Sequence, residues 1–368
     1  MNHTYPIPLV RVLTLGLLLS LGATRPLFAQ IKTAESSAGA PRYGAPEVSR
    51  YRVGASIVAR RGAVQKIRAM VAVPYPCDEQ QVEVVDEDIS EQVDSMTYRD
   101  LPGGARQMLI AVRRLPAGQE ARAIITFEVR TRPILPPRET ANLTIPQKPG
   151  RELKRFLGKS PYIEVGHRKI RAAVKDALVD LDETATDWQR VEAIYDYVQQ
   201  TIDYLEGSDK SAVRTLKDRQ GDCQAISALF VAMCRTEKIP ARIVWVHEHN
   251  YPEFYLEEAG PEGAYPTESG AGSERVSTEV ELGKDRPSAK RVRRTKKAAT
   301  TGHWYPCESS GQRAFGEMPL ARTVLQKGDS FKVPERPRER LRYASDFLIG
   351  LPTPGGGKPN VKYIHEQL

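Results

Sequence analysis

The chain has 368 residues, which at about 150 residues per domain predicts two domains. Hydrophobic residues make up 40% and charged residues 27%, a composition that excludes a collagen, a wholly disordered chain and a polytopic membrane protein. The formal net charge of +8 does not indicate a nucleic-acid partner, because the run 284–297 alone supplies +7 through eight Lys or Arg residues and one Asp.

Residues 1–29 are typical of a secretory signal peptide. Arg11 precedes an apolar run from Val12 to Ala23, and about twelve residues are too few for a helix that crosses a bilayer. Cleavage is expected after Ala29 or, alternatively, after Ala23. We therefore expect a secreted or periplasmic protein with a linker over 30–47 and no membrane span in the mature chain.

Residues 48–135 are predicted to form an antiparallel β-sandwich. Short runs rich in β-branched residues alternate with turn signals such as Arg61-Gly62, a spacing typical of sandwiches. The expected strands are 51–58, 64–73, 81–85, 107–112 and 121–129. We expect this domain to have a structural or docking role. A proline-rich hinge is expected over 136–165, since closely spaced prolines form an extended spacer.

The hydrophobic period becomes helical in the second predicted domain, 166–350. Apolar residues recur at helical spacing from Ile170, and a second helix opens at Thr186 with Gln189 placed for a capping box. A third helix is expected over about 223–237, followed by strands at 241–247, 253–256 and 303–307. Helices followed by strands indicate an α+β domain of helices packed on an antiparallel sheet.

Two low-complexity segments interrupt or end this domain. Residues 257–302 form an insert that is acidic and Gly-rich at first and basic later, with too few apolar residues to bury a core, so we expect a disordered loop. Its basic run, 284–297, is a candidate contact for an anionic surface. A Pro/Gly-rich tail is expected over 351–368.

Cys223 stands at the start of the third predicted helix, directly after Gly221 and Asp222. Asp222 is a favourable N-cap, and the free N–H groups and positive dipole end of a first turn favour a thiolate. In such a place the pKa of a cysteine, about 8.5, can fall to roughly 3.5–7.5. The N–H groups, that of Cys223 included, can also form an oxyanion hole. This position favours a nucleophile.

The other cysteines and two histidines carry no such signal. Cys77, Cys234 and Cys307 are too scattered for a disulfide scaffold, although one or two bridges remain open. Cys234 is eleven residues beyond Cys223, about 16 Å along a helix axis, and is expected in the core. His167 and His365 have no evident partners and are expected at the surface.

A cysteine nucleophile needs a base, and the base needs an acceptor that orients it. His249 follows a predicted strand and opens the run His-Asn-Tyr-Pro-Glu-Phe-Tyr, while Glu308 ends the run Trp-Tyr-Pro-Cys-Glu that begins at Trp304. The order G-D-C, then H-x-aromatic-x-E-x-Y, then W-x-P-x-acid resembles the transglutaminase-like superfamily, which has the papain-like cysteine peptidase fold. The resemblance covers roughly 160–315, and Lys-Ile-Pro-Ala-Arg at 238–242 is similar to a linker of the family.

The resemblance implies a Cys–His–acid triad in which Cys223 attacks an amide or peptide carbonyl, His249 transfers the proton and Glu308 holds the imidazole. It implies a thioester intermediate and a peptide or protein substrate, for which cell-wall peptide is one candidate. No calcium-loop pattern is visible in the sequence, so we expect neither a metal nor a cofactor. Hydrolysis is favoured over cross-linking, because no amine-acceptor site is evident and water is always available. The expected cleft residues beside the triad are Asp222, Gln224, Tyr251, Glu253 and Trp304.

Three features depart from the family pattern. The acid is Glu308, where Asp is more common, and Tyr251 stands where Trp is more common. An insert of about 45 residues also separates the strand after His249 from the strand that ends at Glu308. A hairpin tip tolerates that length, because the cost of closing a loop rises only with the logarithm of its length.

Two other interpretations use the same residues. His247 and His249 share a strand face and, with His303 and Glu253, are the right types for a zinc site of a hydrolase. That hypothesis gives no role to Gly-Asp-Cys at a helix start. Alternatively, the transglutaminase-like fold is kept without catalysis as a binding or scaffold module. The oligomeric state is left open.

Overall fold

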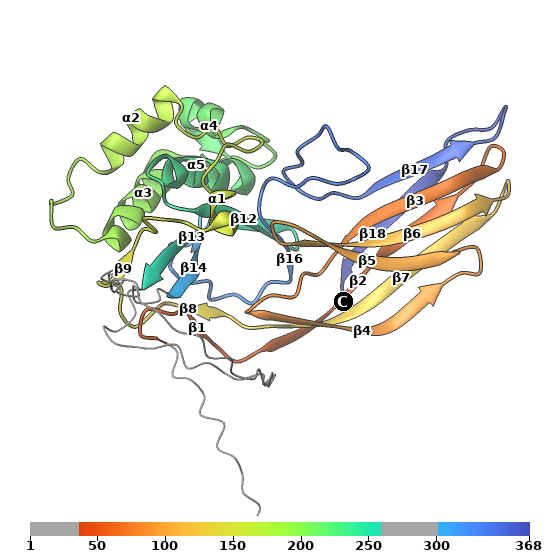
Figure 1. Cartoon of the computed structure of the whole chain (residues 1–368), viewed down its shortest axis with the longest axis horizontal. Helices are drawn as coiled ribbons and strands as arrows, with labels where there is room; N and C mark the ends of the chain where they lie inside the picture. Colours follow the sequence, from red (N-terminus) through yellow and green to blue (C-terminus); the bar gives the residue numbers. More distant parts are fainter. Residues whose placement is uncertain (1–36, 259–300) are drawn as a thin grey trace, which may run out of the picture. The chain divides into compact units, whose positions relative to one another are not determined.

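Two facing antiparallel sheets combine strands from the N-terminal part of the chain with its last two strands (Figure 1). The computed structural model describes residues 37–258 and 301–368, so the expected signal peptide and most of the expected insert lie outside the described residues. One sheet has the order β18-β2-β7-β4, with β2 Glu47–Val58, β4 Gln80–Ile89, β7 Glu120–Thr131 and β18 Asn360–Gln367. The other comprises β3 Val64–Val73, β5 Ser95–Leu101, β6 Ala105–Leu115 and β17 Phe347–Pro352.

The alternation of side chains along each strand explains how the two sheets pack. In β2, every second residue from Tyr51 to Ile57 is almost completely buried and faces a core that β3, β6 and β7 share. Successive strand residues point to opposite faces, so one apolar face per sheet suffices to form a sandwich. The predicted antiparallel sandwich is therefore confirmed. The strand β5 lacks clear apolar alternation and escaped prediction.

The C-terminal segment differs from the expected tail. β18 pairs with β2 along its whole length, from Asn360 opposite Val58 to Gln367 opposite Tyr51, and β17 pairs with β3. The Pro/Gly-rich stretch at 352–359 is only the connection between these two strands. Local composition reveals the connection, whereas the strands depend on partners about 300 residues away in the sequence.

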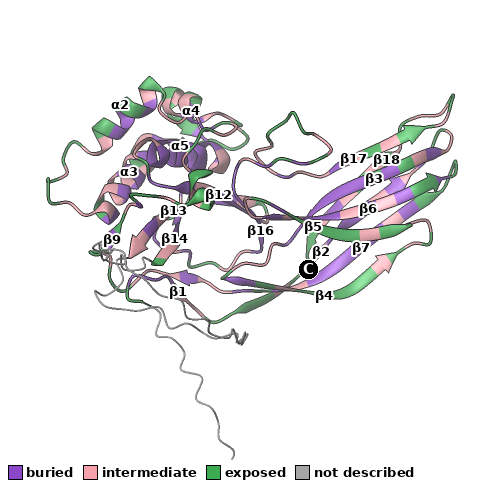
Figure 2. Ribbon diagram, in the orientation of Figure 1, coloured by how far each residue is buried: buried purple, intermediate pink, exposed green. Residues whose placement is uncertain are grey.

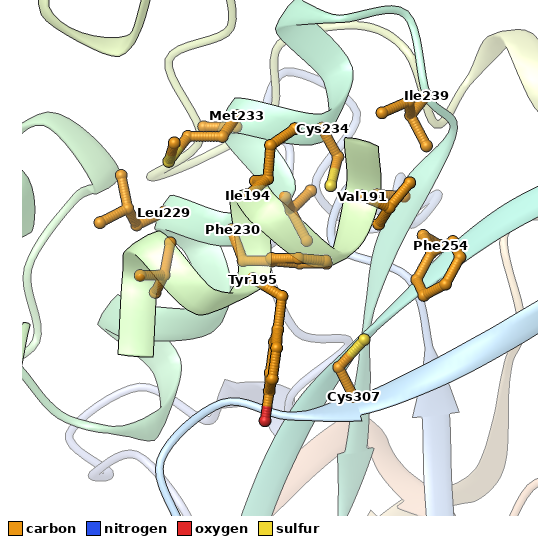
Figure 3. Close-up of a cluster of buried hydrophobic side chains, with 14 of the residues drawn as sticks. Val191, Ile194, Tyr195, Leu229, Phe230, Met233, Cys234, Ile239, Phe254 and Cys307 are labelled. Carbon is orange, nitrogen blue, oxygen red and sulfur yellow. The ribbon is translucent and has the colours of Figure 1, made fainter. Parts of the chain in front are cut away.

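Helices cover a second antiparallel sheet region in the middle of the chain (Figure 1). The helices are α1 Arg151–Lys154, α2 Arg168–Ala177, α3 Asp187–Thr201, α4 Ala212–Asp218 and α5 Cys223–Thr236. The predicted capping box of α3 is present, with Thr186 as the N-cap and Gln189 as its partner. α5 is buried along most of its length and contacts β12 and β13 (Figure 2). Phe230 of this helix belongs to one apolar cluster with Val191 of α3, Phe254 of β13 and their neighbours (Figure 3).

The strands under these helices continue into the sandwich. Their order is β15-β14-β13-β12-β16, with β12 Ala241–Val246, β13 His249–Glu258, β14 Thr301–Glu308, β15 Ala314–Phe315 and β16 Val324–Lys327. β16 then pairs with β6 of the sandwich at Gln326 and Ala105. The hinge expected over 136–165 also packs into this region, since β9 Leu143–Thr144 pairs with the end of β13. The α+β class is confirmed.

Short elements complete the described chain. β1 Arg42–Tyr43 pairs with β8 Ile134–Leu135, and β10 Asp203–Tyr204 pairs in parallel with β11 Gln220–Gly221. The ends of the expected insert, 257–258 and 301–302, are paired strand residues rather than loop. No helix in the described ranges has the length and apolar character needed to cross a bilayer. All four cysteines are free.

Candidate active site

Cys223 is the first residue of α5, and its surroundings explain why the helix begins there. The Asp222 carboxylate accepts a hydrogen bond from the Ala225 N–H at 2.9 Å, which is an N-cap as predicted. Its second oxygen accepts from the Asp209 N–H at 3.1 Å. A Cβ at Gly221 would lie 2.9 Å from the Ala225 Cβ, so only glycine fits directly before the cap. Asp222 therefore positions the thiol by capping the helix.

His249 is positioned by a tight hairpin. β12 ends at Val246, which pairs directly with His249 at the start of β13, so the turn between them has two residues. One of these, Glu248, has a φ of 55°, a left-handed conformation that favours glycine. The hairpin brings His249 to the N-terminal end of α5, because β13 packs against that helix.

Glu308 holds the His249 imidazole. The imidazole Nε2 lies 3.1 and 3.0 Å from the two carboxylate oxygens of Glu308. The Ser310 N–H donates to the same carboxylate at 3.1 Å. The Glu308 carbonyl accepts from the Tyr195 hydroxyl at 2.7 Å and from the Gln199 amide at 2.9 Å, so α3 anchors the backbone of this residue.

The electrostatics of the pair favour a charged imidazole. Burial is the largest influence and lowers the pKa of His249, but hydrogen bonding to Cys223 and Glu308 and the charges of both groups outweigh it and raise the pKa to about 9. Burial likewise raises the pKa of Glu308, and the hydrogen bond and charge of His249 overcome it, so that the net shift is downward. The Glu308 carboxylate and the His249 imidazolium therefore stabilise each other.

Asn250 is a site residue that the sequence analysis missed. Its side-chain Nδ2 donates to the Cys223 Sγ at 3.0 Å, and the residue is 1% exposed. Its Oδ1 has no hydrogen-bond partner in the described part of the chain. The hydrogen bond to Cys223 ties the start of β13 to the first turn of α5. No local signal marks Asn250, because its contact depends on the hairpin that follows β12.

A cavity of about 640 Å³ lies beside Cys223. Gln224, Trp245 and the hairpin residues His247, Glu248, His249 and Asn250 line it together with Cys223. The volume falls within the range of sites that bind small molecules or short peptide segments. The thiol thus faces a space where a carbonyl group could be bound.

The sandwich supplies the other wall of this cavity. Tyr51 of β2 and His365 of β18 line it, as does Asp346 from the segment before β17. His365 Nε2 lies 2.6 Å from the Asp346 carboxylate, and Asp346 also accepts from the Ala72 N–H at 2.7 Å. His365 was expected at the surface without a partner. That expectation was wrong, because β18 carries it back to the cavity.

The expected cleft residues separate into two groups. Gln224 lines the cavity, and Asp222 caps the helix beside it. The remaining three do not line it. Tyr251 is buried in an apolar cluster with Val244 and Val246, Glu253 is buried between Lys327 and Arg242 at 3.1 and 2.8 Å, and Trp304 stacks under Arg242 beside a different cavity. These three side chains are packed against other residues of the fold and do not face the cavity.

The proposed zinc ligands do not converge. His247 packs edge-on against the Tyr51 ring, Glu253 pairs with cations, and His303 lies on β14 opposite Leu256. Among residues 37–258 and 301–368, no group of three or more His, Cys, Asp or Glu side chains is arranged to hold a metal ion. His249 instead pairs with Glu308.

Residues 173–286 match the family model of the transglutaminase-like superfamily. The chain therefore contains a transglutaminase-like domain, as the resemblance implied. The matched range includes Cys223 and His249 and ends before Glu308. None of the curated proteins matches the chain.

Three solved structures are similar. A putative cysteine protease from Cytophaga hutchinsonii has 15% identity and a TM-score of 0.44, covering 88% of this chain and 93% of that one. A putative protease from Parabacteroides distasonis has 12% identity and a TM-score of 0.24, covering 54% and 40%. The periplasmic domain of TgpA from Pseudomonas aeruginosa has 12% identity and a TM-score of 0.28, covering 58% and 88%. At these TM-scores the likenesses do not establish a shared function.

Proposed function

We propose, starting from the transglutaminase-like domain at 173–286, that this protein is a thiol-dependent acyl-transfer enzyme that acts on amide, peptide or isopeptide bonds. One observation carries the proposal. A helix-start cysteine and a histidine line the same cavity, and the His249 imidazole lies 3.0 Å from the Glu308 carboxylate.

The reaction follows from the positions of these groups. The Cys223 thiolate attacks the substrate carbonyl carbon, and the developing oxyanion is stabilised by the backbone N–H groups of the first turn of α5. The His249 imidazolium then protonates the leaving amine and leaves a thioester on Cys223. Water, deprotonated by the now neutral His249, resolves the thioester to a carboxylic acid and restores the starting state.

Asn250 has a supporting role in this scheme. Its amide donates to the Cys223 sulfur at 3.0 Å, and burial fixes the side chain in place. In the free enzyme this donor stabilises the thiolate. When sulfur bonds to the substrate, the same amide is next to the reacting carbon and is available to the oxyanion. Loss of the amide should therefore slow attack without moving the His249–Glu308 pair.

Hydrolysis of a peptide or protein substrate is favoured over transfer to a second amine. Water reaches any open cleft, whereas transfer needs a bound acceptor. The cell-wall peptides are one substrate class that suits the proposed secreted or periplasmic location. Sequencing the N-terminus of the mature protein would test export, with a start at Gln30 or Thr24 as the expected result.

The proposal is tested by incubating the protein with a peptide mixture and with dimethylcasein plus a dansylated amine. Mass spectrometry then detects new peptide ends, which report hydrolysis, and fluorescence detects amine transfer. Cys223→Ala should lose both signals while keeping its melting temperature. His249→Ala should also lose both signals, but with a lower melting temperature at neutral pH, because the charged pair with Glu308 is lost. Cys234→Ser and His167→Ala are the matched controls, since these residues lie in the core and at the start of α2. Equal signals in wild type and Cys223→Ala would contradict catalysis by this thiol and favour a binding module.

A further inference from the structure

A second cavity, of about 570 Å³, lies outside the candidate active site and collects positive charge. Its charged lining consists of five cations, Lys154, Arg155, Lys159, Lys332 and Arg340, and one carboxylate, Asp329. Lys154, Arg155 and Lys159 lie at the end of α1 and directly after it, whereas Lys332 and Arg340 lie in the segment between β16 and β17. We infer that this basic pocket binds a ligand that carries several phosphate groups.

Four of the five cations have no counter-charge in the described part of the chain. Arg155 lies 3.6 Å from Glu152, but the other four have no carboxylate within ion-pair distance in residues 37–258 and 301–368. Asp329 does not neutralise them, because it pairs at 2.7 Å with Arg235, and both side chains are almost fully buried. Gathering like charges in one concavity costs free energy, which a multivalent anion would offset.

The walls of the pocket are held rigidly. The Arg235–Asp329 pair also binds Ser160, whose hydroxyl donates to Asp329 at 2.6 Å, so the segment before α2 is tied to the loop after β16. The Arg235 guanidinium donates to the Gly158 carbonyl as well, at 2.9 Å. A Cβ at Gly328 would lie 2.7 Å from the Gly103 carbonyl oxygen, so the hairpin of the sandwich meets the same loop without a gap. The backbone segments that carry the cations are therefore held in fixed positions.

Two of the cations are placed side by side by a backbone bridge. Phe331 and Leu341 exchange hydrogen bonds of 2.8 and 2.9 Å in an antiparallel bridge. In that register the next residues, Lys332 and Arg340, lie opposite each other on the same side of the bridge. The Ser330 hydroxyl accepts from the Arg340 guanidinium at 3.0 Å, which orients it. Phe331 is fully buried and lines the pocket. A planar guanidinium beside ammonium groups is a combination suited to phosphate oxygens.

The test is isothermal titration calorimetry of the full chain with sodium tripolyphosphate at low ionic strength. We expect one tripolyphosphate per chain and a dissociation constant that rises with added salt. Lys159→Ala/Arg340→Ala should weaken binding at least tenfold, whereas Arg168→Ala/Lys217→Ala removes two exposed cations elsewhere and should leave it unchanged. All four side chains are exposed, so folding should survive and circular dichroism can verify it.

Four outcomes would overturn the inference. Absence of saturable binding would show that the pocket holds no phosphate ligand. Equal weakening in both double variants would mean that diffuse net charge attracts the anion. Binding that is unaffected by the pocket variant would place the anion elsewhere, for example on the run 284–297. Citrate serves as a carboxylate comparison, and tighter binding of citrate than of tripolyphosphate would contradict the assignment to phosphate.

Discussion

The first turn of α5 and its fourth turn carry the same side chain, cysteine, in opposite surroundings. Cys223 is partly exposed beside a cavity and accepts a hydrogen bond from Asn250. Cys234 is fully buried in the apolar cluster between α3, α5 and the sheet, and burial raises the pKa of its thiol (Figure 3). One helix thus offers both a site for a thiolate and a site where a thiolate would be very costly. The position along the helix separates a chemical role from a packing role.

The largest predicted difference comes from making one substitution at both cysteines. Cys223→Ser should reduce turnover by a factor on the order of 10⁴ or more, because members of a catalytic triad act as a unit. It should leave the free energy of unfolding nearly unchanged. Cys234→Ser should keep turnover and lower the free energy of unfolding by about 1–2 kcal/mol, since a hydroxyl enters an apolar core. Activity assays measure turnover, and urea denaturation measures the free energy of unfolding. If both variants lost the same property to the same extent, the predicted difference between the two cysteines would be contradicted.

The charged state of His249 predicts a pH-dependent stability. Its pKa is about 9 in the folded protein against an ordinary 6.5, so its contribution is fully present below pH 6.5 and is lost as the pH rises through 9. That contribution is on the order of 2–3 kcal/mol. Urea denaturation of wild type and His249→Gln at pH 6 and pH 9.5 checks it. We expect the gap between them to close at pH 9.5, and a gap that is independent of pH would contradict the charged pair.

Removing the cap of α5 should have a smaller effect on both properties. Asp222→Ala loses the bond to the Ala225 N–H and should lower the free energy of unfolding by about 0.5–2 kcal/mol. It should also slow alkylation of Cys223, because the first turn frays. Asp222→Asn keeps a capping oxygen and is the control, with thermal denaturation and labelling rates as the readouts. If Asp222→Asn behaves like Asp222→Ala, the carboxylate acts through its charge and capping is not its role.

The smallest predicted effect concerns the turn that positions His249. Glu248 has a φ of 55°, and its side chain is 85% exposed, so Glu248→Gly relieves backbone strain without removing a packed side chain. The free energy of unfolding should rise by up to about 1 kcal/mol. Chemical denaturation measures this change, with Glu317→Gly, at an ordinary backbone position, as the comparison. Destabilisation by Glu248→Gly would show that the left-handed turn carries no strain.

Local patterns in the sequence predicted those parts of the molecule that depend on near neighbours. Thr186 and Gln189 form the predicted capping box, and Asp222 caps α5 as expected, because each bond spans three residues. Cys223 and His249 could be singled out since their motifs are short and ordered. The His249 imidazole lies 3.0 Å from the Glu308 carboxylate, and the catalytic role of the three residues stays a prediction.

The remaining site residues depend on contacts that no local pattern reveals. His365 reaches the cavity only because β18 pairs with β2 across more than 300 residues of sequence. Asn250 reaches Cys223 through a hairpin whose tightness rests on Glu248 adopting a rare conformation. Glu253 was expected in the cleft from its motif, but the partner that buries it, Lys327, lies 74 residues away. Local composition also does not reveal that the strands under the helices are joined to one sheet of the sandwich through the pairing of β16 with β6.

The central claim is that Cys223 is an activated nucleophile paired with His249. The most direct test is the pH dependence of iodoacetamide alkylation at Cys223, followed by mass spectrometry in wild type and His249→Ala, with Cys234 as an internal reference. The account predicts rapid labelling of wild-type Cys223 that persists below pH 7 and is lost in His249→Ala, with Cys234 unlabelled throughout. Slow labelling with a midpoint near pH 8.5 in both proteins would contradict it.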